Sequence, residues 1–136
     1  MPRHRTVAHR TPGADDPVAK FLGTEQAAVM SIVWRRGSAT VREVLEARGR
    51  RAAYTTVMTM MARLNERGFL ARESEGRAFR YRPTKTRDEF LSDLVGSQLD
   101  RLIADFGDTA LMHIVRTVDC LTPDQAAALR RGISDA

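Results

Sequence analysis

The sequence predicts a mainly α-helical protein with one small β-hairpin. Two observations support this class: apolar residues recur at helical spacing through most of the chain, and strict alternation appears only near residues 79–82. The length of 136 residues suits one compact domain, or a small domain followed by an assembly element. Because Cys120 is the single cysteine, the chain can form neither an intramolecular disulfide nor a cysteine-based metal site.

Positive charge is concentrated in the middle of the chain. Residues 20–85 hold 14 Lys/Arg against 6 Asp/Glu, whereas residues 86–136 hold 5 against 9. Clustered cations attract polyanions and release their counterions, although a basic surface also serves solubility. No apolar run reaches the roughly 20 residues that a membrane span needs. We therefore expect a cytoplasmic protein that does not insert into membranes.

The N-terminal part predicts a tail and two helices. Residues 1–19 are rich in proline and charge, which is typical of a disordered basic tail. The first helix is expected within residues 22–37, with Thr24 as its N-cap. A shorter helix follows within residues 38–49, and Thr40 is positioned to cap it.

The third predicted helix, Tyr54–Arg67, carries three threonines, which are middling helix formers. At 100° per residue one wall of this helix is apolar and should face the core; it consists of Val57, Met60, Met61 and Leu64. Thr55 and Thr59 lie on the opposite face. Short hydroxyl and methyl groups let a helix approach DNA, bond base edges or phosphates and touch the thymine methyl. On its flank and at its start, Arg63 and Tyr54 can reach guanine or the DNA backbone.

Two short strands around the sequence SEG follow the third helix. In the second strand Phe79 and Tyr81 alternate with Arg80 and Arg82, which predicts one apolar face and one cationic face. Three helices and this hairpin together predict a winged helix-turn-helix domain over residues 20–84.

The remainder of the chain predicts helices that cannot bury their own apolar surface. A long amphipathic helix is expected from Thr86 to Phe106, and the last helix starts with a capping box of Thr122 and Gln125. A second copy of the chain is the natural cover, so residues 85–136 are predicted to be a helical dimerisation region. The predicted interface consists of Phe90, Leu91, Leu94, Val95, Leu99, Leu102, Ile103 and Phe106.

Three other functional classes compete with DNA binding. A winged helix that binds protein would need an apolar or acidic third helix, which this one is not. A regulator that senses a small molecule stays open, because apolar stripes line cores and pockets alike. An enzyme is not expected, because His4, His9 and His113 show no ligand spacing and no nucleophile motif or Gly-rich phosphate loop occurs.

The chain resembles the penicillinase-repressor family, the BlaI/MecI/CopY group of bacterial transcriptional repressors. The matching stretches are LGTEQAAVMSIVW, ATVREVLE, YTTVMTMMARLNERGFL and EGRAFRYRP, within residues 21–83. The resemblance implies a homodimeric repressor of transcription that binds a palindromic double-stranded operator. No cofactor or metal is expected. It places base and backbone contacts on Thr55, Thr56, Met58, Thr59 and Arg63. Resemblance and charge together suggest phosphate contacts from Arg42, Arg77 and Arg80.

The resemblance also bears on how repression ends. Family members that serve β-lactam antibiotic resistance are cut by a membrane sensor-protease at an Asn-Phe bond in the C-terminal helices. The nearest match is Asp105-Phe106, so Asp stands where those relatives have Asn. Copper-responsive relatives carry a C-terminal Cys-x-Cys cluster, which this sequence lacks.

Overall fold

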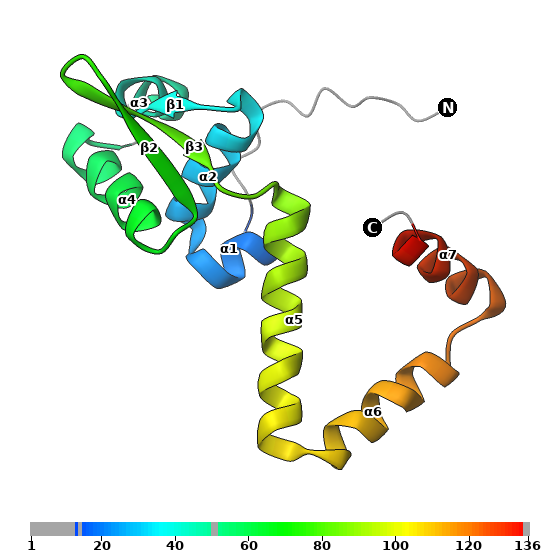
Figure 1. Ribbon diagram of the computed structural model, residues 1–136. Coiled ribbons are helices and arrows are strands. Elements are labelled where there is room, and N and C mark those ends of the chain that lie inside the picture. The colour runs from blue at the N-terminus through cyan, green and yellow to red at the C-terminus, as the bar shows by residue number, and fades with distance from the viewer. Residues whose placement is uncertain (1–12, 14, 50–51, 135–136) are drawn as a thin grey trace. The chain divides into compact units, whose positions relative to one another are not determined.

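Helices and one small antiparallel sheet make up the structure, as the sequence predicts (Figure 1). The computed structural model describes residues 13, 15–49 and 52–134. The elements in chain order are α1 (Pro17–Leu22), α2 (Thr24–Arg36), β1 (Ala39–Thr40), α3 (Val41–Arg48), α4 (Tyr54–Glu66), β2 (Leu70–Glu75), β3 (Ala78–Pro83), α5 (Arg87–Phe106), α6 (Asp108–Asp119) and α7 (Pro123–Ser134). The chain divides into two compact units between Leu91 and Ser92, so α5 begins in the first unit and ends in the second.

Helix α1 corrects the prediction that the tail is disordered through residue 19. The backbone N–H of Val18 donates to Asp16 Oδ1 at 2.8 Å, and Pro17 occupies the first helical position. Val18 and Ala19 are buried in the first unit, which explains why so short a helix is stable. The rest of the predicted tail, residues 1–12 and 14, lies outside the described residues.

The core of the first unit lies between α2, α4 and the sheet. The apolar wall predicted for the third helix is confirmed: Val57, Met60, Met61 and Leu64 are all buried. The predicted cap of the second helix is also confirmed, because Thr40 and Glu43 form a capping box at the start of α3. The predicted cap at Thr24 is wrong. Gly23 is the N-cap of α2, with a φ of 86° that favours glycine.

The sheet has one strand more than the sequence predicts. Strand β1 pairs with β3 at Ala39–Tyr81 and Thr40–Arg80, which gives the antiparallel order β1–β3–β2. The predicted hairpin is confirmed, with Gly76 and Arg77 as its two-residue turn and Gly76 at a φ of 62°. We call residues 70–83 the wing; its turn reaches beyond the neighbouring helices (Figure 1).

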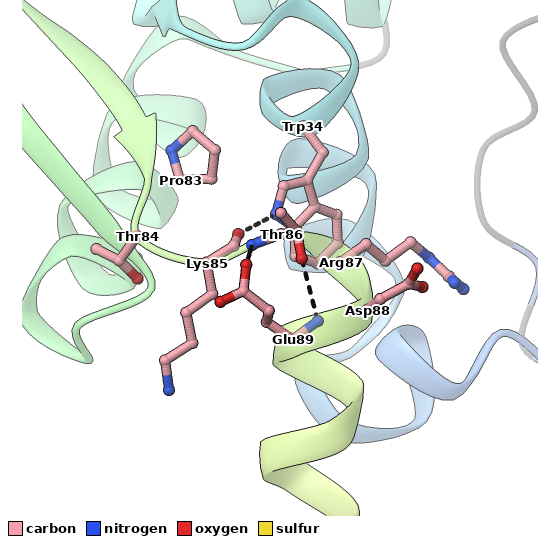
Figure 2. Close-up of a pocket in the computed structure, with 8 residues that line it drawn as sticks. All are labelled: Trp34, Pro83, Thr84, Lys85, Thr86, Arg87, Asp88 and Glu89. Atoms are coloured by element: carbon pink, nitrogen blue, oxygen red, sulfur yellow. Dashed lines mark hydrogen bonds between the residues drawn. The ribbon is translucent and has the colours of Figure 1, made fainter. Parts of the chain in front are cut away.

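Two sets of hydrogen bonds fix the passage from the wing into α5, beside a pocket of about 540 Å³. Figure 2 shows the residues that line this pocket. Trp34 Nε1 donates to the carbonyl oxygen of Lys85 at 2.9 Å. The backbone N–H of Thr86 donates to Glu89 Oε1 at 3.2 Å, and that of Glu89 donates to Thr86 Oγ1 at 3.1 Å. This capping box was not predicted, although its residue types have the required spacing.

Phe90 belongs to the core of the first unit. Its side chain is 4% exposed, and its ring lies 5.0 Å from that of Phe69, 5.6 Å from Trp34 and 6.0 Å from Phe21. A side chain enclosed in this way within one chain has no surface left for a second copy. The prediction that Phe90 lies in the dimer interface is therefore wrong, and the first unit extends past the predicted boundary at residue 84 to Leu91.

The second unit leaves its apolar side chains open. Among its described residues none is buried, and Val95, Leu102, Phe106 and Val115 are between 46% and 61% exposed. A groove of about 370 Å³ runs between the end of α5 and α6 and is lined by Leu99, Leu102, Phe106, Thr109, Ala110, His113, Ile114 and Thr117. The capping box predicted at the start of α7 is confirmed by the bonds between Thr122 and Gln125.

Candidate nucleic-acid interface

The outward face of α4 exposes every residue that the sequence places there. Opposite the buried wall lie Tyr54, Thr55, Thr56, Met58, Thr59 and Arg63, all of them exposed. The side chains of Tyr54 and Met58 are 47% and 44% exposed, which is high for such apolar groups. The face therefore combines short polar side chains with apolar groups. Its first turn carries no acidic residue, and the exposed Glu66 lies at its C-terminal end.

The hydroxyl of Thr59 is already engaged within α4. Thr59 Oγ1 donates to the carbonyl oxygen of Thr55 at 2.9 Å, one turn earlier in the helix. Since the hydroxyl hydrogen is used in this bond, Thr59 offers its methyl group and an acceptor oxygen to any surface that approaches.

The start of α4 is suited to an anion. Ala53 is the N-cap, none of the described side chains caps the helix, and the first turn contains no acidic residue. The first backbone N–H groups of the helix point along its axis and carry its positive dipole end. A DNA phosphate placed beside Tyr54 would meet these donors.

The wing carries cations in two different states. Arg77 lies exposed in its turn, and the guanidinium of Arg72 stacks over the exposed Phe79 ring at 4.3 Å from the centroid. Arg82 pairs loosely with Glu73 at 3.8 Å. The contact between Arg72 and Phe79 was not predicted. The one feature of the sequence that could have indicated it is the diagonal position of the two residues across the hairpin.

Arg80 is enclosed by acceptors instead of facing outward. Its Nη2 lies 2.9 Å from Glu43 Oε1, its Nε lies 2.9 Å from Glu75 Oε2, and its Nη1 donates to Ser38 Oγ at 3.3 Å. The hydrogen bond from Arg80 lowers the pKa of Glu43, and both glutamates raise the pKa of Arg80. With two carboxylates already around its guanidinium, Arg80 is not available as a phosphate contact, which corrects that prediction.

Arg42 is the remaining cation predicted to meet phosphate. It is the second residue of α3 and is exposed. Arg42, Arg63 and Arg77 thus lie on the surfaces of α3, α4 and the wing, respectively. Their contacts with phosphate stay a prediction.

The residues predicted to form the dimer interface differ in exposure. Leu91, Leu94 and Ile103 are half-buried within one chain, whereas Val95, Leu99, Leu102 and Phe106 are exposed. The Asp105-Phe106 bond lies at the end of α5, directly before Gly107, and both of its residues are exposed.

Neither a metal-ligand cluster nor a membrane-spanning helix occurs among the described residues. No three His, Cys, Asp or Glu side chains among them come together as metal ligands would. In the same part of the chain, no helix combines the length and the apolar character of a membrane span.

Comparisons with known proteins identify the family of the chain. The family model described as penicillinase repressor matches residues 22–135. The transcriptional regulator BlaI of Mycobacterium tuberculosis (strain H37Rv) is 39% identical over 119 residues, which are 84% of this chain and 83% of that protein. The penicillinase repressor of Bacillus licheniformis is 29% identical over 75 residues, 54% of this chain and 59% of that one.

A solved structure of BpsR from Bordetella bronchiseptica matches 82% of this chain and 74% of its own at 23% identity, with a TM-score of 0.39, which is too distant to bear on function. The two relatives above are a regulator and a repressor, not enzymes. The family model matches residues of both units and spans most of the chain. The aligned region shared with BlaI covers a similar share of the chain. The chain therefore belongs to the penicillinase repressor family.

Proposed function

We propose that the protein is a homodimeric, sequence-specific DNA-binding repressor that acts at a palindromic operator. The observation that carries the proposal is the outward face of α4, where threonines, Met58 and Arg63 lie opposite a fully buried apolar wall. Residues kept only for solubility would more often be Glu, Lys and Gln, which are better helix formers. The repressor among its relatives supports the same reading.

In this proposal α4 enters the major groove and the surrounding cations hold the backbone. Thr55, Thr59 and Met58 would meet base edges, while Arg42, Arg77 and the N-terminal end of α4 would meet phosphates. A two-fold dimer presents two such helices to successive grooves, so the half-sites should lie one or more helical turns apart. Repression follows from occupation of the promoter, which places the protein in the cytoplasm with the DNA.

The second unit supplies the dimer. Its exposed apolar side chains along α5 and α6 need a cover, and monomeric proteins rarely leave so continuous an apolar surface in water. An isologous pairing of two copies would bury this surface on both at once. Dimerisation then makes the second half-site an intramolecular target, so its loss should weaken operator binding steeply.

Thr59→Glu tests the DNA-binding face. A carboxylate at this position faces the phosphates and should abolish operator binding in a gel shift, while sedimentation shows an unchanged dimer. Thr24→Glu is the matched control, because Thr24 is an exposed threonine on α2 whose replacement adds the same charge. Equal binding by the Thr59 variant and the wild type would remove α4 from the interface.

Phe106→Asp and Leu102→Asp test the dimer. Each places a charge on the exposed apolar surface of α5 and should yield monomers in sedimentation equilibrium. Gln98→Asp, at an exposed polar position of the same helix, should leave the dimer intact. A dimer that survives both apolar replacements would exclude this part of α5 from the interface.

Proteolysis at Asp105-Phe106 by a membrane sensor-protease is the proposed route of relief. The bond lies in the last turn of a helix, where few hydrogen bonds must open before a protease can bind the chain. Mass spectrometry of the protein from cells treated with a β-lactam should find a fragment that ends at Asp105. An intact chain under inducing conditions would reject this route.

The second candidate is a repressor released by a small molecule. The apolar groove of about 370 Å³ between α5 and α6 favours it, because a groove of this size can hold a small ligand. A thermal-shift screen separates the two candidates. A ligand that raises the melting temperature of the protein and weakens operator binding would support release by a small molecule. If the second copy of the chain covered the whole groove, release by a small molecule in this groove would be excluded.

A further inference from the structure

A cluster of ion pairs joins the wing to the helix before α4. We call Glu43, Arg80 and Glu75 the wing clamp. Arg80 on β3 lies between Glu43 of α3 and Glu75, the last residue of β2, with an N–O distance of 2.9 Å to each. Arg36 adds a weaker contact to Glu43 at 3.3 Å.

The wing clamp acts where the backbone support of the wing ends. Strand β1 pairs with β3 at Tyr81 and Arg80. From Phe79 to the turn, the described residues of the two wing strands pair only with each other. A two-stranded hairpin without further packing is marginally stable and twists freely. Arg80 is thus the last residue of β3 that β1 holds, and its side chain extends that support to Glu75.

One end of the wing clamp is itself rigid. Glu43 is fixed by the capping box, in which its backbone N–H donates to Thr40 Oγ1 at 3.2 Å and its carboxylate accepts from the Thr40 N–H. The other end, Glu75, directly precedes Gly76 and Arg77. The clamp therefore transmits the position of α3 to the turn that carries Arg77.

We infer that Arg80 is a positioning residue, which holds the wing through Glu43 and Glu75 so that Arg77 meets the DNA backbone, and which itself does not touch DNA. The inference rests on the proposed function. The alternative is that the two glutamates only weaken DNA binding by their negative charge. Removing Glu75 should lower the affinity for DNA if Arg80 positions the wing, and raise it if the alternative holds.

Glu75→Met provides the test, with Glu73→Met as the matched control. Both glutamates lie on β2 and on the same face, but Glu73 pairs only loosely with Arg82 and is no part of the wing clamp. Loss of a negative charge near DNA should by itself tighten binding. Glu73→Met should therefore bind equally or more tightly, whereas Glu75→Met should bind about three- to tenfold more weakly.

The probe is a duplex selected in vitro on the wild-type protein, and the measurement is its Kd as a function of salt. In Glu75→Met the slope of log K against log salt should fall by about 0.9, because one phosphate contact is lost. In an Arg77→Met background the same Glu75 substitution should cause no further loss. Glu43→Gln, which can keep the capping box, should reproduce the weakening.

The possible outcomes distinguish the positioning role of Arg80 from the proposed function of the protein. Tighter binding by Glu75→Met, or a loss that persists in the Arg77→Met background, overturns the positioning role. Failure of the wild type to select any duplex overturns the proposed function instead. Circular dichroism checks folding, and Glu75→Gln replaces Glu75→Met should that variant not fold.

Discussion

Thr59 bonds back to Thr55: its hydroxyl donates to the Thr55 carbonyl oxygen at 2.9 Å across one turn of α4. The bond orients the side chain, because the hydroxyl must lie against the helix. The methyl group is then free to face outward, on the exposed side of α4 away from the buried wall. A methyl group in the major groove distinguishes thymine by apolar contact with its C5-methyl.

Thr59→Val should therefore bind the selected operator within about threefold of the wild type, whereas Thr59→Ser should bind about tenfold more weakly. Valine keeps the outward methyl and serine removes it. Replacing single thymines of the duplex by uracil, which lacks the C5-methyl, should weaken the wild type at one position in each half-site and leave Thr59→Ser unaffected. Strong binding by the serine variant would show that the hydroxyl reads the DNA instead.

Phe90→Ala should lower the free energy of unfolding of the first unit by about 3–5 kcal/mol, because it empties a site enclosed by three aromatic rings. Urea unfolding followed by Trp34 fluorescence measures this. Phe106→Ala is the comparison, since Phe106 is 61% exposed and should leave that transition unchanged while it weakens the dimer. A Phe90→Ala variant that is stable but monomeric would show that Phe90 lies in the dimer interface.

Glu43 should make stability depend on pH. Its pKa is lowered from the ordinary value of 4.5, chiefly by the hydrogen bond from Arg80, so the carboxylate stabilises the fold above 4.5 and loses this effect as pH falls through the lowered pKa. The difference in unfolding free energy between wild type and Glu43→Gln should shrink from about pH 6 to about pH 3. A difference that stays constant would contradict the ion pair.

Trp34→Phe should cost about 1 kcal/mol of unfolding free energy, because it keeps a ring against Phe90 but removes the donor to the Lys85 carbonyl. Thermal unfolding followed by circular dichroism provides the measurement, since the variant has no tryptophan to report fluorescence. An unchanged melting temperature would mean that water replaces the indole N–H without cost.

The helices of the first unit could be predicted because their signals are local. The apolar wall of α4 and the box of Thr40 and Glu43 depend on residues three or four apart, which the sequence displays directly. Helix α1 and strand β1 were missed because elements of six and two residues are too short to show a period. Both elements are stabilised by contacts with other elements: α1 buries Val18 and Ala19, and β1 pairs with β3.

The errors at the site have a different cause. Phe90 and Phe106 lie on one continuous apolar stripe, and a stripe does not show whether its cover comes from the same chain or from another. Arg80 was assigned to phosphate from the alternation within the wing, yet its partner Glu43 lies 37 residues away along the chain. Only the folded structure brings those charges together.

If the open apolar surface of the second unit pairs two chains, as proposed, gene dosage should affect repression. If that unit gains most of its stability from association, then its folding and its pairing share one dependence on concentration. At low copy number the chains would be separate and susceptible to degradation, and promoter occupancy would rise more steeply than in proportion to the number of chains. A modest fall in synthesis would then release the promoter sharply, with no inducer at all.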